Sequence, residues 1–502
     1  MNATCPSPAT IPIRPGSIEE FATVRNYLKE TGFTETNVRA RVECKATLLE
    51  LLDKPDVSVS DTLWLLIKVF LQRRKVALSE TEGHIPEKVL AAFLSMGLLS
   101  RDPEGGLYAP VLLTPTPSGY YVADGGVEPG GKMLDDAVYP PSSPPTQTFL
   151  HFLPRDRCRR LLEIGTGSGV CSILAAREYA DEVWASDLTE RSVEFAEFNR
   201  VFNGVGNLTV LQGDLYGAVG GMTFDRIIAH PPYVPVLRKK YVFYDGGRDG
   251  EEITKRIFQG LTEHLEPGGR CYCKALGSDR DLPFEQRIRE WLGTASEDFD
   301  IVVAQWDEIP PAQLFARLSL GSARAEEDFD SWQQFCQEIR IRSFLNCMIV
   351  AQRRPTERPV FTARRFISAR SNPESLLWLL NWETIATERD PGALVLTSKP
   401  RIADGVELTL KRRWEKDAWL PVESRIKTEY PFALDAVMDE WMPSLLEYCT
   451  GQATTEEIFL RASADKLFPA ATTKAAFSDL MAALVRRGFL ETEEFSLPAA
   501  TG

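Results

Sequence analysis

The fold of this chain is decided by the stretch LLEIGTGSGV (residues 161–170), which VWASDL (183–188), LQGDL (211–215) and FDRIIAHPPYVP (224–235) follow in order. Each segment contains an apolar run that stops at small or acidic residues. Buried parallel strands have this appearance when their carboxyl ends open onto a ligand site. The four segments therefore predict an α/β protein built around a doubly wound parallel sheet.

The first segment predicts a strand, a glycine-rich turn and a helix. The turn contains Gly165, Thr166, Gly167 and Gly169. Glycine permits positive φ and lets a ligand approach the backbone closely, although an ordinary strand-to-helix loop can have the same composition. The glycines are not spaced as GxGxxG and no lysine follows them, so neither the dinucleotide fingerprint nor the phosphate-binding loop is matched.

Acidic residues stand at the ends of the next two predicted strands. Asp187 follows the glycine turn by about 20 residues, a position from which a carboxylate can bind the hydroxyls of a ribose. A helix capped by Thr189 should follow it. Asp214 ends the third strand and is placed to meet the edge of an adenine. The spacing thus indicates a ligand that contains a nucleoside.

These motifs resemble those of the class I methyltransferases that use S-adenosylmethionine, and Glu163-x-Gly165-x-Gly167-x-Gly169 resembles their glycine motif. The resemblance implies a Rossmann-like sheet of seven strands with S-adenosyl-L-methionine as cofactor. It also implies that Glu163 approaches the methionine amino group, that Asp187 holds the ribose hydroxyls and that Asp214 meets the adenine amine. The cofactor residues implied are Glu163, Gly165, Thr166, Gly167, Gly169, Asp187, Leu188, Asp214, Leu215 and Thr146.

His230-Pro231-Pro232-Tyr233 resembles the Asn/Asp-Pro-Pro-aromatic motif of N-methyltransferases, and the likeness to release-factor glutamine and ribosomal guanine methyltransferases extends over residues 141–354. In that motif a side-chain oxygen and a backbone carbonyl accept the two N–H groups of a planar amine or amide, while the aromatic ring packs on it. The resemblance assigns catalysis to His230, Pro231, Pro232 and Tyr233. It assigns substrate binding to the loop residues Tyr244, Asp245, Gly246, Gly247 and Arg248.

His230 departs from the pattern, which has Asn or Asp at this position. A neutral imidazole accepts only one hydrogen bond, so His230 would orient an amine less fully than Asn does. It could instead act as a general base, since the pKa of histidine is near 6.5 when unperturbed. A base would suit a hydroxyl, a carboxylic acid or an ammonium group, and His230 could also do no more than pack beside the substrate.

Four functions remain open. The favoured one is methyl transfer to a nitrogen of a protein or peptide side chain, such as a glutamine amide. The alternatives are a base N-methyltransferase of ribosomal or transfer RNA, an N-, O- or C-methyltransferase of a small metabolite with His230 as base, and a cofactor-binding assembly module without catalysis. Arg238, Lys239 and Lys240 could meet phosphates, but the net charge of −14 counts against an RNA substrate.

Breaks in composition predict three domains. A Gly- and Pro-rich linker lies at residues 125–145, and prolines recur at Pro355 and Pro359. Helical and strand-like patterns resembling winged helices occur on both sides of the methyltransferase segment, where they would dock the substrate. The domains predicted are 1–135 (helical and winged-helix-like), 136–356 (methyltransferase) and 357–502 (α+β, ending in a winged-helix-like module). In the last domain we expect strand-like segments at 392–400, 405–415 and 419–431, and a helical run at 434–448.

Composition predicts a cytoplasmic protein. The N-terminal residues are polar and proline-rich, unlike a signal peptide, and no apolar run is long enough to span a membrane. The nine cysteines are odd in number and scattered, as expected in a reducing compartment, and they suggest no metal site. The partner expected is the methyl acceptor, with no membrane. The sequence leaves the oligomeric state open.

Overall fold

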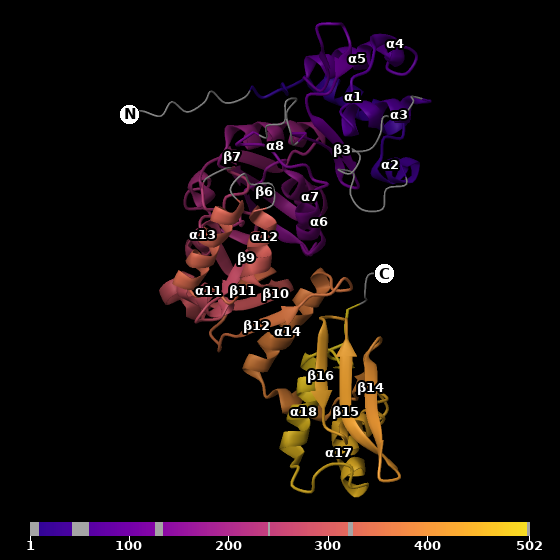
Figure 1. The fold of residues 1–502 in the computed structure, drawn as a ribbon, viewed down its shortest axis with the longest axis vertical. Helices are drawn as coiled ribbons and strands as arrows, with labels where there is room; N and C mark the ends of the chain where they lie inside the picture. Colours follow the sequence, from indigo (N-terminus) through magenta and orange to yellow (C-terminus); the bar gives the residue numbers. More distant parts are fainter. Residues whose placement is uncertain (1–9, 43–59, 126–133, 239–240, 320–324, 499–502) are drawn as a thin grey trace. The chain divides into compact units, whose positions relative to one another are not determined.

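The computed structural model describes residues 10–42, 60–125, 134–238, 241–319 and 325–498 (Figure 1). These residues group into two compact units. The first lies within residues 1–150 and 155–276, and the second within residues 151–154 and 277–502. The predicted linker at 125–145 extends in part beyond the described residues.

An eight-stranded sheet has the strand order β12-β10-β11-β9-β8-β5-β6-β7. Strands β5 to β9 pair in parallel, β10 is antiparallel to β11, and β12 is parallel to β10. The mostly parallel sheet confirms the α/β, Rossmann-like prediction, and it has one strand more than the seven expected because β12 adds to the edge strand β10. The strands are β5 (Cys158–Ile164), β6 (Ala180–Asp187), β7 (Leu208–Gln212), β8 (Phe224–Ala229), β9 (Leu265–Asp279), β10 (Phe299–Ile309), β11 (Ser343–Arg353) and β12 (Thr362–Phe366).

The strand order reverses at β5, which places the carboxyl ends of three strands side by side. After β5 the chain forms β6 and β7 on one side and then returns to form β8 on the other. Ile164 at the end of β5 lies opposite Ser186 of β6 and Ala229 of β8. Such a reversal is where open α/β sheets bind their ligands, because the loops that leave the two neighbouring strands diverge there.

Of the helices that accompany β5 to β9, the one after β6 begins at a side-chain cap, whereas those that begin at Val170 and Glu252 have none. Thr189 caps the helix after β6 by accepting a hydrogen bond from the Ser192 N–H, as predicted. The helix before β5 starts at Pro144. The helices are α6 (Pro144–His151), α7 (Val170–Glu178), α8 (Glu190–Phe202), α9 (Glu252–Gln259) and α10 (Leu261–His264), and a short 3-10 helix follows β7 (Leu215–Ala218).

The N-terminal part of the first unit consists of short helices and two hairpins. Its later portion has helices followed by a small hairpin, which is the order of elements that a winged helix would have; that assignment stays a prediction. The elements are α1 (Ile18–Glu30), α2 (Glu35–Val42), α3 (Thr62–Leu66), a π-helical turn (Ile67–Leu71), α4 (Leu78–Thr81), α5 (Glu87–Ser95), β1 (Ser100–Arg101) with β2 (Leu107–Tyr108), and β3 (Leu112–Thr116) with β4 (Gly119–Ala123).

One hydrophobic core joins these N-terminal elements to α8. The ring centroids of Phe21 on α1 and Phe198 on α8 lie 5.0 Å apart, and Phe202 belongs to the same cluster. An ion pair of two buried side chains reinforces the junction, with the Arg191 Nη2 atom 2.6 Å from the Asp124 Oδ1 atom. The N-terminal residues therefore pack directly on a helix of the parallel sheet.

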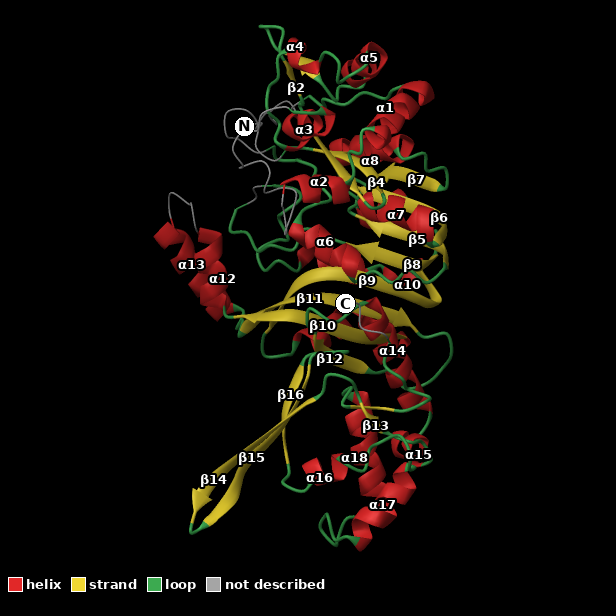
Figure 2. Ribbon diagram, turned by 90° about the vertical axis from the view of Figure 1, so that its right-hand side faces the viewer, coloured by secondary structure: helices red, strands yellow, loops and turns green. Residues whose placement is uncertain are grey.

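The second unit contains the strands β10 to β12, several helices and a small three-stranded antiparallel sheet. Figure 2 shows β14 and β15 as a long two-stranded arm that stands out from helices α16 to α18 of the same unit. The remaining elements are α11 (Phe284–Leu292), α12 (Pro311–Ser319), α13 (Ala325–Glu338), α14 (Pro373–Glu388), α15 (Pro391–Leu396), β13 (Arg401–Ile402), β14 (Glu407–Glu415), β15 (Ala418–Thr428), β16 (Leu434–Met438), α16 (Met442–Leu446), α17 (Thr455–Ala464), α18 (Lys474–Arg486) and β17 (Leu490–Glu491).

Two predictions for the C-terminal part are wrong. Most of the segment 392–400 is helical rather than extended, because Pro391 starts α15 and the Asp390 side chain caps it by accepting from the Gly392 N–H. The run 434–448 is a strand followed by a short helix, because its first residues pair with β15. The strands β14 and β15 were predicted correctly. No helix of the described residues is long and apolar enough to cross a bilayer.

Candidate active site

The glycine turn after β5 has the backbone conformation that its residues suggested. Gly165, Gly167 and Gly169 have φ values of +75°, +53° and +78°. A Cβ atom on Gly169 would lie 3.3 Å from the Ala196 side chain on α8, so this glycine lets the helix pack closely. A Cβ atom on Gly167 would have no described atom within 4 Å. Gly167 therefore borders open space, as a cofactor-binding residue must.

Glu163 is buried at the end of β5, where its hydrogen bonds stabilise the glycine turn. Its Oε2 atom accepts hydrogen bonds from the Thr166 hydroxyl at 2.7 Å and from the Ser172 N–H at 2.9 Å. Burial raises the pKa of Glu163 to about 7, although these hydrogen bonds oppose the rise. The predicted residues Glu163 and Thr166 thus lie together and hold the start of α7 against the turn.

Asp187 joins the end of β6 to the same turn. Its Oδ2 atom accepts the Gly167 N–H at 2.9 Å, and its Oδ1 atom accepts the Thr189 N–H at 3.2 Å. Loss of hydration raises the pKa of Asp187, and the backbone donors partly offset this effect. The carboxylate therefore lies beside the one glycine of the turn that borders open space.

The His-Pro-Pro-Tyr segment leaves β8 beside the glycine turn. A Cβ atom on Gly165 would lie 3.8 Å from the carbonyl oxygen of His230, so the two predicted motifs are neighbours. The imidazole of His230 lies between two aromatic rings, with centroid distances of 5.2 Å to Phe149 on α6 and 5.7 Å to Tyr233. The His230 and Tyr233 rings are nearly parallel, at 17°.

The surroundings of His230 favour the neutral form of its imidazole. Burial, and then the positive charge of Lys274, lower the pKa of His230 from 6.5 to about 3. A neutral ring of this kind has one nitrogen that can accept a hydrogen bond and one that can donate.

The loop of residues 244–250 packs against the backbone of Tyr233. The Val234 N–H donates to the Tyr244 carbonyl at 3.2 Å, and the Gly246 N–H donates to the Val234 carbonyl at 3.0 Å. A Cβ atom on Gly246 would lie 2.7 Å from the Tyr233 backbone, which explains why this position is glycine. Burial raises the pKa of Tyr233 to about 12, with Tyr244 nearby. The structure therefore brings the predicted substrate loop onto the predicted catalytic segment.

The other members of the predicted loop differ in exposure. The Asp245 Oδ1 atom accepts the Gly247 N–H at 2.9 Å, so Asp245 shapes the turn of the loop. Arg248 is exposed. Of the basic run proposed for phosphate contacts, Arg238 is exposed, while Lys239 and Lys240 lie outside the described residues.

Four further residues were predicted to contact the cofactor, and they differ in exposure and in hydrogen-bond partners. Asp214 is exposed, and its Oδ2 atom pairs with the Arg256 Nη2 atom at 2.7 Å. Leu188 is 55% exposed beside Asp187, and Leu215 has a φ of +52°. Thr146 is on α6 and its hydroxyl accepts from Ser143 at 2.8 Å. Contact of these four with a cofactor stays a prediction.

Sequence reasoning missed two residues of the site, Phe149 and Lys274. Phe149 lies one helical turn after Thr146 on α6 and contacts His230. Lys274 is 2% exposed on β9, and its Nζ atom lies 5.8 Å from the ring centroid of Tyr233. The only signal for Lys274 in the sequence is a charge inside the apolar run RCYCKAL.

The residues at the glycine turn have the shape and polarity that S-adenosylmethionine requires. The open space at Gly167, the carboxylate of Asp187 beside it and the turn braced by Glu163 form the kind of backbone cradle and ribose acceptor that such a ligand needs. Among the described residues, no three His, Cys, Asp or Glu side chains gather as metal ligands would.

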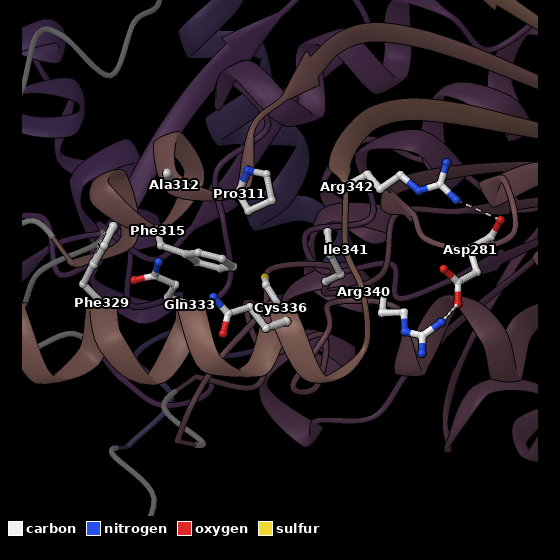
Figure 3. Close-up of a pocket in the computed structure, with 11 residues that line it drawn as sticks. Asp281, Pro311, Ala312, Phe315, Phe329, Gln333, Cys336, Arg340, Ile341 and Arg342 are labelled. Carbon is white, nitrogen blue, oxygen red and sulfur yellow. Dashed lines mark hydrogen bonds and ion pairs between the residues drawn. The ribbon is translucent and has the colours of Figure 1, made fainter.

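A separate cavity of about 500 Å³ lies in the second unit, between α12, α13 and the segment after β9 (Figure 3). Phe315, Phe329 and Cys336 line one part of it. At the other part, Arg340 and Arg342 both reach Asp281, the first through an ion pair of 2.8 Å. None of the predicted site residues lines this cavity.

Comparison with known proteins gives a family match for the central part of the chain. Residues 143–298 match the family model described as the methyltransferase small domain. This range contains the glycine turn, Asp187, the His-Pro-Pro-Tyr segment and Lys274.

Curated relatives with similar sequences are named as protein glutamine methyltransferases. The ribosomal protein uL3 glutamine methyltransferase of Bradyrhizobium diazoefficiens is 32% identical, over 28% of this chain and 49% of the relative. A putative protein N5-glutamine methyltransferase of Methanocaldococcus jannaschii is 35% identical, over 22% of this chain and 57% of the relative. The release factor glutamine methyltransferase of Koribacter versatilis is 29% identical, over 29% and 56%. The chain thus spans about half the length of these relatives.

Among solved structures, a ribosomal protein L11 methylase from Lactobacillus delbrueckii is 18% identical, covering 40% of this chain and 71% of that one, with a TM-score of 0.23. A methyltransferase from Pyrococcus furiosus is 20% identical, covering 43% and 87%, with a TM-score of 0.27. These structural similarities are weak, so the similarity to methyltransferases rests on the sequence matches, the ordered motifs and the sheet. The central part of this chain, residues 143–298, is thus similar to the methyltransferase small domain, and the curated relatives that it resembles are named as protein glutamine methyltransferases.

Proposed function

We propose that this protein transfers a methyl group from S-adenosylmethionine to the side-chain amide nitrogen of a glutamine in a protein. One observation carries the proposal: the His230 carbonyl lies next to Gly165, so the candidate cofactor turn and the candidate acceptor segment border the same space. Methyl transfer requires little more than this, since donor and acceptor must be held in line at close range.

The glycine turn and Asp187 would hold the cofactor. Gly167 leaves room for it, and the Asp187 carboxylate can accept from the ribose hydroxyls. The exposed side chain of Leu188 offers apolar contact area beside that carboxylate. When bound, the cofactor supplies an electrophilic methyl group on a sulfonium, so that transfer forms a C–N bond and breaks a C–S bond with the electron pair passing to sulfur.

The His-Pro-Pro-Tyr segment would hold the amide. A neutral His230 can accept one amide N–H through the lone pair of a ring nitrogen, and a backbone carbonyl of the proline segment can accept the other. The prolines fix φ and remove two competing N–H donors from the segment. The Tyr233 ring can pack on the planar amide. The nitrogen loses one proton during transfer; because a methylated amide that still carries this proton is strongly acidic, the proton passes to water without a protein base.

A general base acting on a hydroxyl or ammonium group is the less favoured role for His230. A base works best when its pKa is near the working pH, and the pKa of His230 is lowered to about 3 by burial and by Lys274. Such a ring is a weak base at neutral pH but a fully available hydrogen-bond acceptor. This argues for an amide or exocyclic amine and against the small-metabolite alternative that needs a base.

The names of the curated relatives favour a protein acceptor, and the net charge of −14 disfavours a nucleic acid. We further propose that the regions flanking the methyltransferase segment, residues 1–135 and 357–502, help to dock that protein. Both are large enough to bind a folded partner, and no residue that we assign to the chemistry lies in either of them.

The experiment is a methylation assay with three acceptor pools. The purified protein and isotope-labelled S-adenosylmethionine are incubated with the release factor, the ribosomal protein uL3 and total RNA of the same host. We expect label in protein, and peptide mass spectrometry should place one added methyl group on a glutamine. Label confined to RNA or to small molecules would show that the acceptor is of another class.

A further inference from the structure

Strands β14 and β15 form an arm whose outer part is exposed to water (Figure 2). All nine residues of β14 are exposed, and so are the first five residues of β15. Four of these side chains are large and apolar: Leu408 and Leu410 are 45% and 49% exposed, and Trp414 and Trp419 are 55% and 61% exposed. Exposed apolar side chains that gather on one element indicate a surface that binds another molecule.

The four apolar side chains lie on the same face of the arm. Residues opposite each other in an antiparallel pair share a face, and so does every second residue of a strand. Leu408 lies opposite Ile426, and Trp414 lies opposite Trp419 with its ring centroid 5.5 Å away. Ile426 is 2% exposed and belongs to the hydrophobic core that includes residues of α16 to α18. The apolar face of the arm therefore continues outward from that core.

The other face of β14 and its outer edge offer charge and hydrogen bonds. Lys411 and Arg413 are exposed on that face and alternate with the apolar residues along the strand. Among the residues that the structure describes, β14 pairs with β15 alone, so its outer edge is open. Every second residue of an edge strand directs its N–H and C=O away from the sheet, where they can pair with a further strand.

We propose that β14 binds an extended segment of a partner protein as an added strand, and that this segment alternates apolar with acidic residues. Backbone pairing would supply affinity, and the side chains would supply specificity. The apolar residues of the segment would lie beside Leu408 and Leu410, and its acidic residues beside Lys411 and Arg413 on the other face. The inference deepens the proposal that residues 357–502 dock the acceptor protein, and it rests on that proposal for the identity of the partner.

The charges of β14 argue against a second copy of this chain at the same edge. The basic run of residues 411–413 lies at the centre of β14, so two copies paired antiparallel along their full length would bring these runs opposite each other. Like charges directly opposite each other destabilise a sheet, and basic side chains on an edge strand oppose pairing between copies. The same run attracts a segment with acidic residues.

The composition of the arm favours a peptide over a nucleic acid. A ribbon that holds phosphates has a clear basic excess, whereas residues 407–428 contain six basic and four acidic residues. Bases stacked on Trp414 or Trp419 would also leave the open backbone edge of β14 without a partner. A strand uses the edge, the apolar face and the cations together.

The test uses the full-length chain and a synthetic nine-residue peptide in which valine and glutamate alternate. Two further peptides carry N-methyl groups, one on the glutamate amides and the other on the valine amides. A strand directs the amides of alternate residues toward its neighbour, so only one of these two peptides should lose binding. The remaining probes are the same peptide with lysine in place of glutamate and an oligouridine of equal length. Calorimetry measures affinity, and hydrogen exchange followed by mass spectrometry locates the bound peptide.

We expect the glutamate peptide to bind and to slow hydrogen exchange in β14. The lysine peptide and one of the two methylated peptides should bind roughly tenfold more weakly or worse. Lys411→Gln combined with Arg413→Gln should weaken binding of the glutamate peptide by a similar factor. Arg461→Gln combined with Lys466→Gln is the matched control, because it removes the same two charges from exposed positions of the same unit, and it should leave the affinity unchanged.

Several results would overturn strand addition at β14. These are the absence of binding by the glutamate peptide, equal binding of the glutamate and lysine peptides, equal binding of the two methylated peptides, and slowed exchange elsewhere than in β14. Tighter binding of oligouridine than of the glutamate peptide would assign the arm to nucleic acid instead.

These measurements need no methyl transfer, so they separate the inference from the proposed function. If the peptides behave as expected but neither the release factor nor uL3 becomes methylated, the proposed acceptor is wrong and strand addition at β14 stands. If one of those proteins is methylated on glutamine while the glutamate peptide fails to bind, the proposed function stands and the role of β14 is wrong.

Discussion

Asn199 on α8 and Val122 on β4 form a closed pair of hydrogen bonds in the buried interior of the first unit. The Asn199 Nδ2 atom donates to the Val122 carbonyl at 2.9 Å, and the Val122 N–H donates to the Asn199 Oδ1 atom at 2.8 Å. The same Nδ2 atom donates to the Ser168 carbonyl in the glycine turn at 2.8 Å. One side chain therefore connects the N-terminal region to the turn that would hold the cofactor.

The first prediction follows from this connection. Asn199→Leu removes the partners of a buried N–H and two buried carbonyls, so unfolding should become easier by roughly 1–3 kcal/mol. Affinity for S-adenosylhomocysteine should fall as well, because the turn loses its contact at Ser168. Asn199→Asp keeps the acceptor oxygen but loses both N–H donors. Its stability and its affinity for S-adenosylhomocysteine should lie between those of the wild type and those of Asn199→Leu. Thermal unfolding and calorimetry measure the two effects, and full affinity in a destabilised Leu variant would disprove the coupling.

The second prediction concerns Gly167. Gly167→Arg places a long side chain in the open space beside the turn, so binding of S-adenosylmethionine should be abolished. Gly220→Arg is a matched control, because Gly220 also has positive φ (+56° against +53°) and no described atom within 4 Å of a Cβ position. Both variants carry the same backbone strain, and the control should keep its affinity. Equal loss in the two proteins would point to strain rather than to a blocked site.

The third prediction concerns Asp187. Asp187→Ala leaves the Gly167 N–H and the ribose hydroxyls without their acceptor, which should weaken binding by roughly 1–3 kcal/mol. Asp187→Asn keeps an oxygen for the Gly167 N–H but loses the charge, so its loss should be smaller. Calorimetry with S-adenosylhomocysteine measures both affinities. An Ala variant that binds like the wild type would remove Asp187 from the cofactor site.

The fourth prediction concerns the pH dependence of His230. With its pKa lowered to about 3, the folded protein keeps this ring neutral over the neutral range, so activity should not change through a histidine titration between pH 6 and 8. His230→Asn provides an acceptor without ionisation, and activity should be kept or raised. A fall in turnover of about 10²–10⁴ in the Asn variant, the usual contribution of a positioned base, would restore the base role.

The lowered pKa also has a consequence for stability. Between the folded pKa of about 3 and the unfolded value of about 6.5, the unfolded chain binds a proton at His230 and the folded chain does not. Stability should therefore rise with pH across this range and should be lost as pH falls below 6.5. Urea unfolding at pH 7.5 and pH 5 measures the difference, which should be smaller in His230→Asn than in the wild type.

The fifth prediction concerns removal of the N-terminal region. A chain that begins at residue 139 uncovers Phe195, Phe198 and Phe202 of α8, which are 0%, 5% and 0% exposed in the intact protein. It also leaves the buried Arg191 without Asp124. We expect this fragment to aggregate, as size-exclusion chromatography would show. A monodisperse fragment that binds S-adenosylhomocysteine would mean that the first unit divides at this linker.

The motifs could be predicted from the sequence because their signals are local. A strand that ends in a glycine turn, and an acidic residue at the end of the next strand, are properties of a few adjacent residues. Gly165, Gly167, Gly169 and Asp187 accordingly lie where they were expected. Local pattern was insufficient for residues 392–400 and 434–448, where a proline start and pairing with β15 decided between helix and strand.

The electrostatic character of the site depends on the tertiary structure. The sequence shows that an imidazole follows β8, but it leaves open whether that ring is charged, a base or an acceptor. Lys274 stands 44 residues farther along the chain and reaches the ring only because β8 and β9 pair side by side. The pKa of a group depends on its hydration and on neighbouring charges, and both are set by which strands are neighbours. The sequence thus specifies the residue His230, whereas its neutral state depends on how the sheet folds around it.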